Sequence, residues 1–123
     1  GAPAARQGEV NWQPWTPERF AELRAAGTPM FIDFTAAWCV TCQVNKRSTL
    51  RHPEVEQALQ ARGIVTLQAD WTRRDEAITR ELSRLGRSGV PVYAFYRSGQ
   101  DPVLLPEVLT PALMLQALEA LPR

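Results

Sequence analysis

Hydrophobic and polar positions follow one another along this chain in short segments that predict alternating strands and helices. Three apolar runs bounded by turn residues, at 30–34, 64–69 and 92–96, are typical of strands. The run at 30–34 is continuously apolar except for Asp33, which favours a buried central strand. A short edge strand is expected where Trp12 and Trp15 flank Pro14, and Ser98-Gly99 predicts a hairpin turn into a last strand at 103–105.

Helix signals fill the intervals between these runs. Thr16-Pro17 and Thr110-Pro111 are each typical of a helix start, and Gly27 is a stop signal for the first of these helices. A further helix is expected from near Trp38 or Cys39 to about residue 50, followed by a second piece from residue 53 to Gly63. Thr72 and Asp75 resemble a capping box for the helix whose buried stripe is Ile78, Leu82 and Leu85.

The resulting order is β-α-β-α-β-α-β-β-α. Parallel crossovers followed by a closing hairpin predict an α/β domain with a mixed central sheet and helices on both faces. Residues 1–10 are small and polar without periodicity, so we interpret them as a linker or an expression remnant and expect one domain over 11–123.

Composition and charge narrow the class of partner. The chain has 123 residues, of which 45% are hydrophobic and 22% are charged, as in ordinary globular domains. Fourteen Lys and Arg against thirteen Asp and Glu give a net charge of +1, which argues against nucleic acid or a lipid surface as the main partner. The apolar runs are far shorter than a membrane span, and no signal peptide is recognisable.

The two cysteines, Cys39 and Cys42, form a single CxxC motif at a predicted strand-to-helix junction. Free N–H groups at a helix start favour a thiolate at Cys39, and a spacing of three places Cys42 on the same helix face. We expect Cys39 to be exposed and Cys42 to point back toward the strands. The pair then suits dithiol–disulfide exchange, with Cys39 attacking and Cys42 resolving, and it needs no cofactor.

Asp33 interrupts the predicted central strand six residues before Cys39. Burial raises the pKa of a carboxyl group, so Asp33 is a candidate acceptor for the proton of Cys42. The alternative is that Asp33 has only a structural role, with its carboxyl group hydrogen-bonded in the core.

Other interpretations of the cysteines are less favourable. A structural disulfide closing about four residues contributes only about 2 kcal/mol through loop entropy. A zinc site needs about four ligands, and His52, the only histidine, has no companions, so no metal is expected. His52 precedes Pro53 and is interpreted as a helix-start or turn residue.

Two further features are candidates for partner binding. Trp38 lies beside Cys39 and is either a packing residue or part of a docking surface. Val90-Pro91 opens a strand after a glycine-containing loop. A trans proline is the ordinary case there, whereas a cis bond would turn the Val90 backbone toward an incoming extended peptide; the spacing leaves both open.

Four segments occur in order along the chain: DFTAAWCVTCQVNK from Asp33, ADWT from Ala69, GRSGVPVYAFY from Gly86 and LPEVLTP from Leu105. They resemble the thioredoxin superfamily, and more closely the C-terminal periplasmic domain of the DsbD family and of related copper-sensitivity suppressor reductases. The resemblance implies a thioredoxin-like fold, with Cys39 as nucleophile, Cys42 as resolving cysteine, Asp33 as buried acid and Pro91 as a cis-proline beside them. Members of the family often have an acidic residue where this chain has Lys46, whose charge would instead favour a thiolate.

The resemblance also implies a working context. The domain would be a protein-disulfide reductase on the periplasmic face of the bacterial inner membrane, monomeric in isolation. It would take electrons from a transmembrane portion of the same parent protein and pass them to an N-terminal periplasmic domain. A free-standing periplasmic thioredoxin-like protein, serving cytochrome c maturation or a copper-tolerance pathway, and a non-catalytic thiol redox sensor are the alternatives.

Overall fold

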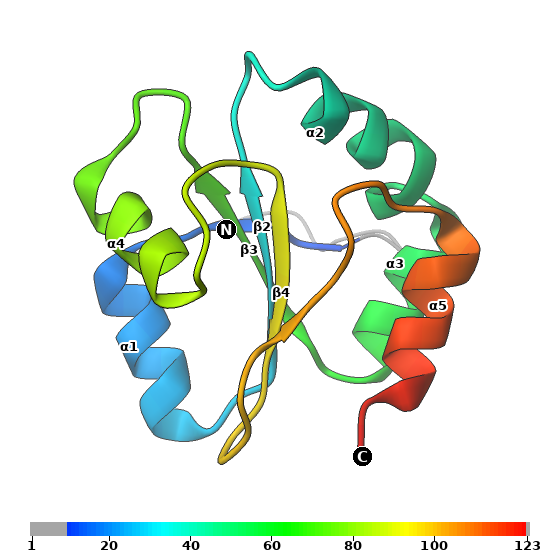
Figure 1. Ribbon diagram of the computed structural model, residues 1–123. Coiled ribbons are helices and arrows are strands. Elements are labelled where there is room, and N and C mark those ends of the chain that lie inside the picture. Colours follow the sequence, from blue (N-terminus) through cyan, green and yellow to red (C-terminus); the bar gives the residue numbers. More distant parts are fainter. Residues whose placement is uncertain (1–9, 123) are drawn as a thin grey trace, which may run out of the picture.

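A five-stranded sheet forms the centre of the computed structural model, which describes residues 10–122. Its order is β1-β3-β2-β4-β5 (Figure 1). The strands are β1 (Gln13–Pro14), β2 (Met30–Thr35), β3 (Val65–Asp70), β4 (Val92–Tyr96) and β5 (Val103–Leu104). The three apolar runs thus become the three inner strands, and β1 is the expected short edge strand.

The sheet is mixed, as the sequence predicts. Both β1 and β2 run parallel to β3, whereas β4 runs antiparallel to β2 and β5 antiparallel to β4. The helical connections from β1 to β2 and from β2 to β3 return the chain to the same end of the sheet and give parallel strands. After the helical connection from β3, the chain instead enters β4 in the opposite direction, and the turn at Gly99 then gives the antiparallel hairpin of β4 and β5. Strand β2 lies in the middle, and all six of its residues are buried.

Helices cover both faces of the sheet (Figure 1). Helices α1 (Pro17–Ala26) and α4 (Glu76–Arg84) pack on one face, where their apolar residues join Met30, Ile32 and Phe34 of β2. Helices α3 (Pro53–Ala61) and α5 (Pro111–Ala120) pack on the other, against Phe31. The alternation of β2 therefore places Asp33 and Thr35 on the α3 and α5 face, because side chains two residues apart share a face.

The helix starts are set by side-chain caps. Thr16 and Thr110 accept backbone N–H groups of α1 and α5 as expected, and His52 caps α3 through Nδ1. The predicted capping box at Thr72 and Asp75 is wrong. Asp75 alone is the N-cap of α4, because its carboxylate accepts the N–H of Ile78 while the hydroxyl of Thr72 is engaged elsewhere.

The helical segment after the CxxC motif also differs from expectation. It has α geometry only over α2 (Val40–Asn45) and continues as a π-helix, η1 (Lys46–Leu50). Its first residue is Val40, with Cys39 as the cap. The wider turn of the π-helix accompanies the packing of Thr49 and Leu50 into the core, a tertiary feature that the apolar spacing alone does not encode.

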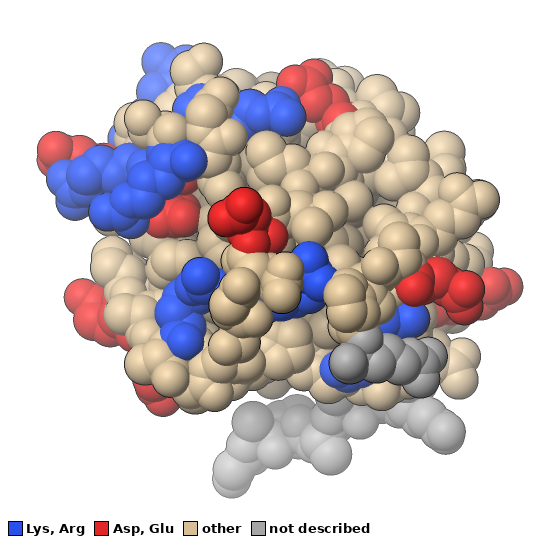
Figure 2. All heavy atoms as spheres, turned by 60° about the horizontal axis from the view of Figure 1, so that its bottom comes forward, with Lys and Arg blue, Asp and Glu red and all other residues tan. Residues whose placement is uncertain are grey.

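Charged side chains of both signs are scattered over the surface seen in Figure 2, with uncharged areas between them. This distribution agrees with the near balance of acidic and basic residues in the sequence. Within residues 10–122, none of the helices has the length and apolar character that crossing a bilayer requires.

Candidate active site

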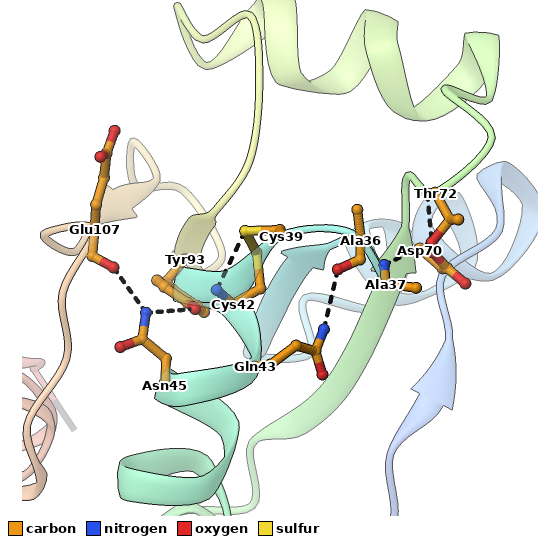
Figure 3. The surroundings of a disulfide bond; sticks show 10 residues. All are labelled: Ala36, Ala37, Cys39, Cys42, Gln43, Asn45, Asp70, Thr72, Tyr93 and Glu107. Carbon is orange, nitrogen blue, oxygen red and sulfur yellow. Dashed lines mark hydrogen bonds between the residues drawn. A yellow bond between two sulfur atoms is a disulfide. The ribbon is translucent and has the colours of Figure 1, made fainter.

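The two cysteines lie at the junction between strand β2 and helix α2. The strand ends at Thr35, and Cys39 is the extended N-cap residue of α2. Its Sγ accepts the backbone N–H of Cys42 at 3.2 Å, and the two sulfurs are joined in a disulfide with Cα atoms 5.2 Å apart (Figure 3). The sequence prediction that the pair sits at a strand-to-helix junction and closes on itself is confirmed.

Cys39 is much less exposed than the sequence analysis predicted. Cys39 is 8% exposed and Cys42 is 0% exposed, because Ala36 and the partly buried Val90 pack against both. The order of accessibility nevertheless agrees with the prediction, since the small remaining contact with solvent belongs to Cys39. An incoming thiolate or disulfide can therefore reach the pair only at Cys39.

Hydrogen bonds from the segment that follows β3 and from α2 hold the loop before Cys39 in place. Thr72 accepts the N–H of Ala37 through Oγ1 at 2.8 Å, and its carbonyl accepts the indole N–H of Trp38 at 3.0 Å. The same hydroxyl donates to the carboxylate of Asp70, and Gln43 of α2 donates to the carbonyl of Ala36. Sequence analysis missed this function of Thr72, because a Thr three residues before an Asp also matches a helix cap.

Asn45 connects α2 to β4 and to the segment that precedes α5. It is 1% exposed, and its Nδ2 donates to the Tyr93 hydroxyl at 2.8 Å and to the Glu107 carbonyl at 2.7 Å (Figure 3). Its Oδ1 accepts the N–H of Leu109 at 3.0 Å. Sequence analysis also missed Asn45; its spacing of three from Cys42, on the buried face of a short helix, was the available signal.

Trp38 is half exposed beside Cys39. Besides its hydrogen bond to Thr72, it stands 6.0 Å from the ring of Trp71, and the guanidinium of Arg74 lies 5.4 Å above its ring. Arg74 adopts a positive φ of 52° in the loop before α4. Trp38 is therefore held by several contacts while about half of its surface remains exposed to solvent.

The Val90-Pro91 peptide bond is cis, as the resemblance implies. Val90 is partly exposed and contacts the cluster of Ala36, Cys39 and Cys42, whereas Pro91 is buried. The fold thus brings the start of β4 next to Cys39 although 51 positions separate Val90 from Cys39 in the chain.

Asp33 is 2% exposed in the middle of β2, with Gln68 of β3 and Tyr93 of β4 as its register partners. Burial raises the pKa of its carboxyl group from 3.8 to about 7, while the charge of Lys46 and a hydrogen bond from Gln68 act in the opposite direction. The expectation of a raised pKa is confirmed. A carboxyl that titrates near neutral pH can accept and release a proton under ordinary conditions.

Lys46 is half buried at the start of η1, one helical turn after Cys42. Its positive charge lowers the pKa of Asp33, and it also lowers that of Asp70 after the larger effect of the hydrogen bonds from Thr72. The positive charge of Lys46 therefore acts on the buried carboxyl group of Asp33.

His52 is occupied as the cap of α3, as interpreted from the sequence. Among residues 10–122, no group of three or more His, Cys, Asp and Glu side chains is arranged to hold a metal ion. The site combines a disulfide, in which Cys39 is the less buried cysteine, with a buried carboxyl group on β2, a combination suited to thiol–disulfide exchange.

Comparison with known sequences agrees with this geometry. Residues 11–98 match the model of a family described as thioredoxin-like. The chain is 40% identical over 76 residues to the thiol:disulfide interchange protein DsbD of Cronobacter sakazakii, and 35% identical over 83 residues to that of Vibrio cholerae. These matches cover 62% and 68% of this chain but only 13% and 14% of the two relatives.

Solved structures have the same fold. The C-terminal domain of Neisseria meningitidis DsbD in its reduced form gives a TM-score of 0.67 at 26% identity, over 80% of this chain and 86% of that one. A thioredoxin from Thermus thermophilus gives 0.70 at 23% identity, over 90% and 85%. The expected thioredoxin-like fold is therefore confirmed.

The raised pKa of Asp33 predicts that stability depends on pH. In the unfolded chain this carboxyl ionises near its ordinary pKa, and in the folded protein only near 7, so the folded state is progressively destabilised between about pH 4 and pH 7. A rise from 3.8 to about 7 corresponds to about 4 kcal/mol. We expect Asp33→Asn to gain up to that amount over the parent protein, measured by urea unfolding of the disulfide form from pH 4 to pH 8.

Asp101→Asn, at an exposed loop position, is the matched control and should follow the parent protein at every pH. A constant difference in unfolding free energy between Asp33→Asn and the parent across this range would contradict the assignment of a buried, late-titrating carboxyl group to Asp33.

Removing the charge of Lys46 should move the titration of Asp33. Because the ammonium group favours the carboxylate, Lys46→Met is expected to raise the pKa of Asp33 further above 7. The measurement is the carboxyl titration of Asp33 by infrared difference spectroscopy, with Asp33→Asn identifying the band. Arg47→Met removes an exposed neighbouring charge and should leave the titration unchanged; equal midpoints in the two variants would show that Lys46 does not act on Asp33.

Proposed function

The chain belongs to the thioredoxin-like family, and from that premise we propose that it is a protein-disulfide reductase domain working by dithiol–disulfide exchange at Cys39 and Cys42. The observation that supports this most directly is the disulfide at the start of α2, in which only Cys39 touches solvent. Proteins that match the chain at 35–40% identity are named thiol:disulfide interchange proteins.

In the proposed reaction, the dithiol form of the domain is the reductant. The Cys39 thiolate attacks one sulfur of a partner disulfide, and the partner's other sulfur leaves as a thiolate. Cys42 then attacks Cys39, so that the mixed disulfide breaks and the Cys39–Cys42 bond forms. Two electrons pass to the partner, which ends as a dithiol.

We assign the proton transfers to two features of the site. The N–H of Cys42, which already bonds to the Cys39 sulfur, stabilises negative charge on that atom. Asp33 is the proposed acceptor for the proton of Cys42, since a base with a pKa of about 7 matches the pH at which the thiol must ionise.

The proposed partner surface surrounds Cys39. It consists of the half-exposed Trp38 and of Val90 just before β4, with the buried Pro91 supporting Val90 rather than contacting the partner. Val40 and Val44 of α2 are also exposed, and they extend the apolar area on the same side of the helix. Another redox protein is the expected occupant.

We propose the wider context from the similarity to DsbD. The chain spans about 13–14% of the length of the curated relatives it matches, so it corresponds to one domain of a much longer protein. In that setting it would lie on the periplasmic face of the inner membrane and relay electrons from a transmembrane portion to periplasmic redox domains. A free-standing periplasmic thioredoxin-like protein would use the same site.

Cysteine substitutions test the proposed order of attack. Cys39→Ser should abolish reduction of a disulfide partner, whereas Cys42→Ser should accumulate a mixed disulfide through Cys39, because the resolving thiol is missing. The reaction uses the interchain disulfides of intact insulin as substrate and is followed by non-reducing electrophoresis and mass spectrometry. Ala25→Ser, at an exposed position of α1 outside the proposed partner surface, is the control and should reduce the substrate normally.

Failure to recover any trapped species with Cys42→Ser would count against exchange chemistry. Catalytic amounts of the parent protein should turn over many substrate molecules when a reductant regenerates the dithiol. A redox sensor would instead change its binding with oxidation state and show no turnover.

The direction of electron flow is tested by the reduction potential. A reductase requires a potential toward the reducing end of the range, which equilibration with glutathione buffers of known ratio measures directly. The Cys39→Ser/Cys42→Ser double variant controls for glutathione bound elsewhere. A potential of about −120 mV, as for strong oxidants, would show that electrons flow from the partner to this domain, opposite to the proposed direction.

A further inference from the structure

Polar side chains form a strip across the two inner strands β2 and β3. In-register pairing places Asp33 of β2 beside Gln68 of β3, and Thr35 beside Asp70. Residues paired in register, and residues two apart on one strand, share a face of the sheet. All four side chains therefore lie on the face of Phe31, against which η1, α3 and α5 pack.

Two atoms of this strip are buried without a partner in the protein. Asp33 and Thr35 are each 2% exposed, and among residues 10–122 neither Oδ1 of Asp33 nor Oγ1 of Thr35 has a hydrogen-bond partner. A buried polar atom left unpaired costs about 1–3 kcal/mol, so two of them on adjacent positions of one face need a physical explanation. Bound water commonly satisfies such groups.

The spacing of the two residues suits one bridging water. Positions two apart on a strand are separated by roughly 7 Å between Cα atoms. Because both side chains stand on the same face, two hydrogen bonds of about 2.8 Å each to a single water could join their two unpaired oxygens. The hydroxyl of Thr35 can both donate and accept, and so it can orient that water toward the carboxyl group.

The strip also leads from the core to the surface. Asp33 lies in the middle of β2, Thr35 is the last residue of that strand, and Asp70, opposite Thr35, is exposed. The hydrogen bonds from Thr72 lower the pKa of Asp70, so this carboxylate stays ionised at the outer end. Exposure increases along the strip in the direction of Asp70.

We propose that Thr35 is a positioning residue that holds a water molecule against Asp33 and so opens a route by which the proton taken from Cys42 leaves toward Asp70. This inference deepens the proposed function and rests on it. In the first transfer the S–H bond of Cys42 breaks and an O–H bond forms on Asp33. In the second, that O–H bond breaks, the bound water takes the proton and releases one to bulk water, and the carboxylate is restored without movement of electrons.

Side chains on the elements around Asp33 influence its protonation state, so that its carboxyl group can both take up and release the proton. Gln68 of β3 donates a hydrogen bond to the carboxyl group and Lys46 of η1 contributes a positive charge, and both favour the carboxylate. Tyr93 of β4 is neutral, because burial raises the pKa of its hydroxyl well above the usual value. The charge that favours proton release therefore comes from Lys46 alone among the groups that shift Asp33.

The test isolates the Cys42 step. Mixing the reduced protein with Ellman's reagent releases one thionitrobenzoate when Cys39 attacks and a second when Cys42 resolves the mixed disulfide, so the second phase reports deprotonation of Cys42. We expect Thr35→Val to slow the second phase about tenfold and to move its pH profile to higher pH, leaving the first phase unchanged. Thr35→Ser, which keeps the hydroxyl, should restore both the rate and the profile.

Thr66→Val is the matched control, because it removes another buried threonine hydroxyl from the same face of β3, one that bonds to the carbonyl of Asn11. It should behave as the parent protein. Equal slowing in Thr35→Val and Thr35→Ser, or parent-like kinetics in Thr35→Val, would overturn the inference.

Asp33→Asn separates this inference from the proposed function. If Asp33→Asn slows the second phase and Thr35→Val does not, Asp33 accepts the proton and the route through Thr35 is wrong. If Asp33→Asn leaves the second phase unchanged, the acceptor role itself fails, and the inference about Thr35 fails with it.

Discussion

The hydrogen bond from the Cys42 N–H to the Cys39 sulfur is the interaction on which the site depends. It makes Cys39 the cap of α2, so the same geometry that starts the helix places a donor on the reactive sulfur. A cap of this kind works only if the preceding loop is fixed. Thr72 fixes it by binding Ala37 and Trp38, and Asn45 fixes the helix by binding three groups outside it.

Burial of one carboxyl group is the second constraint. Asp33 occupies a position in the central strand where an apolar residue would pack without cost, and its desolvation raises its pKa to about 7. Lys46 and Gln68 limit that rise. The chain thus keeps a destabilising group in the strand that leads to its disulfide, and strongly shifted carboxyl groups of this kind are common at functional sites.

Local patterns were enough to predict most of the fold and the centre of the site. Short apolar runs give β2, β3 and β4 within a residue of their observed ends, and Thr-Pro pairs give the starts of α1 and α5, because strand burial and helix capping depend on adjacent residues. The CxxC motif and the charge that interrupts an apolar strand likewise pointed to Cys39, Cys42 and Asp33 as candidate site residues.

What the sequence by itself determined is therefore the order of the elements and the identity of the reactive groups. Only the tertiary structure decided that Val90 covers Cys39, that Thr72 binds the loop instead of capping α4, and that Lys46 acts on Asp33. Contacts of this kind join segments far apart in the chain or side chains on different layers. Their geometry follows from how the sheet and helices pack together, which no short stretch of residues encodes.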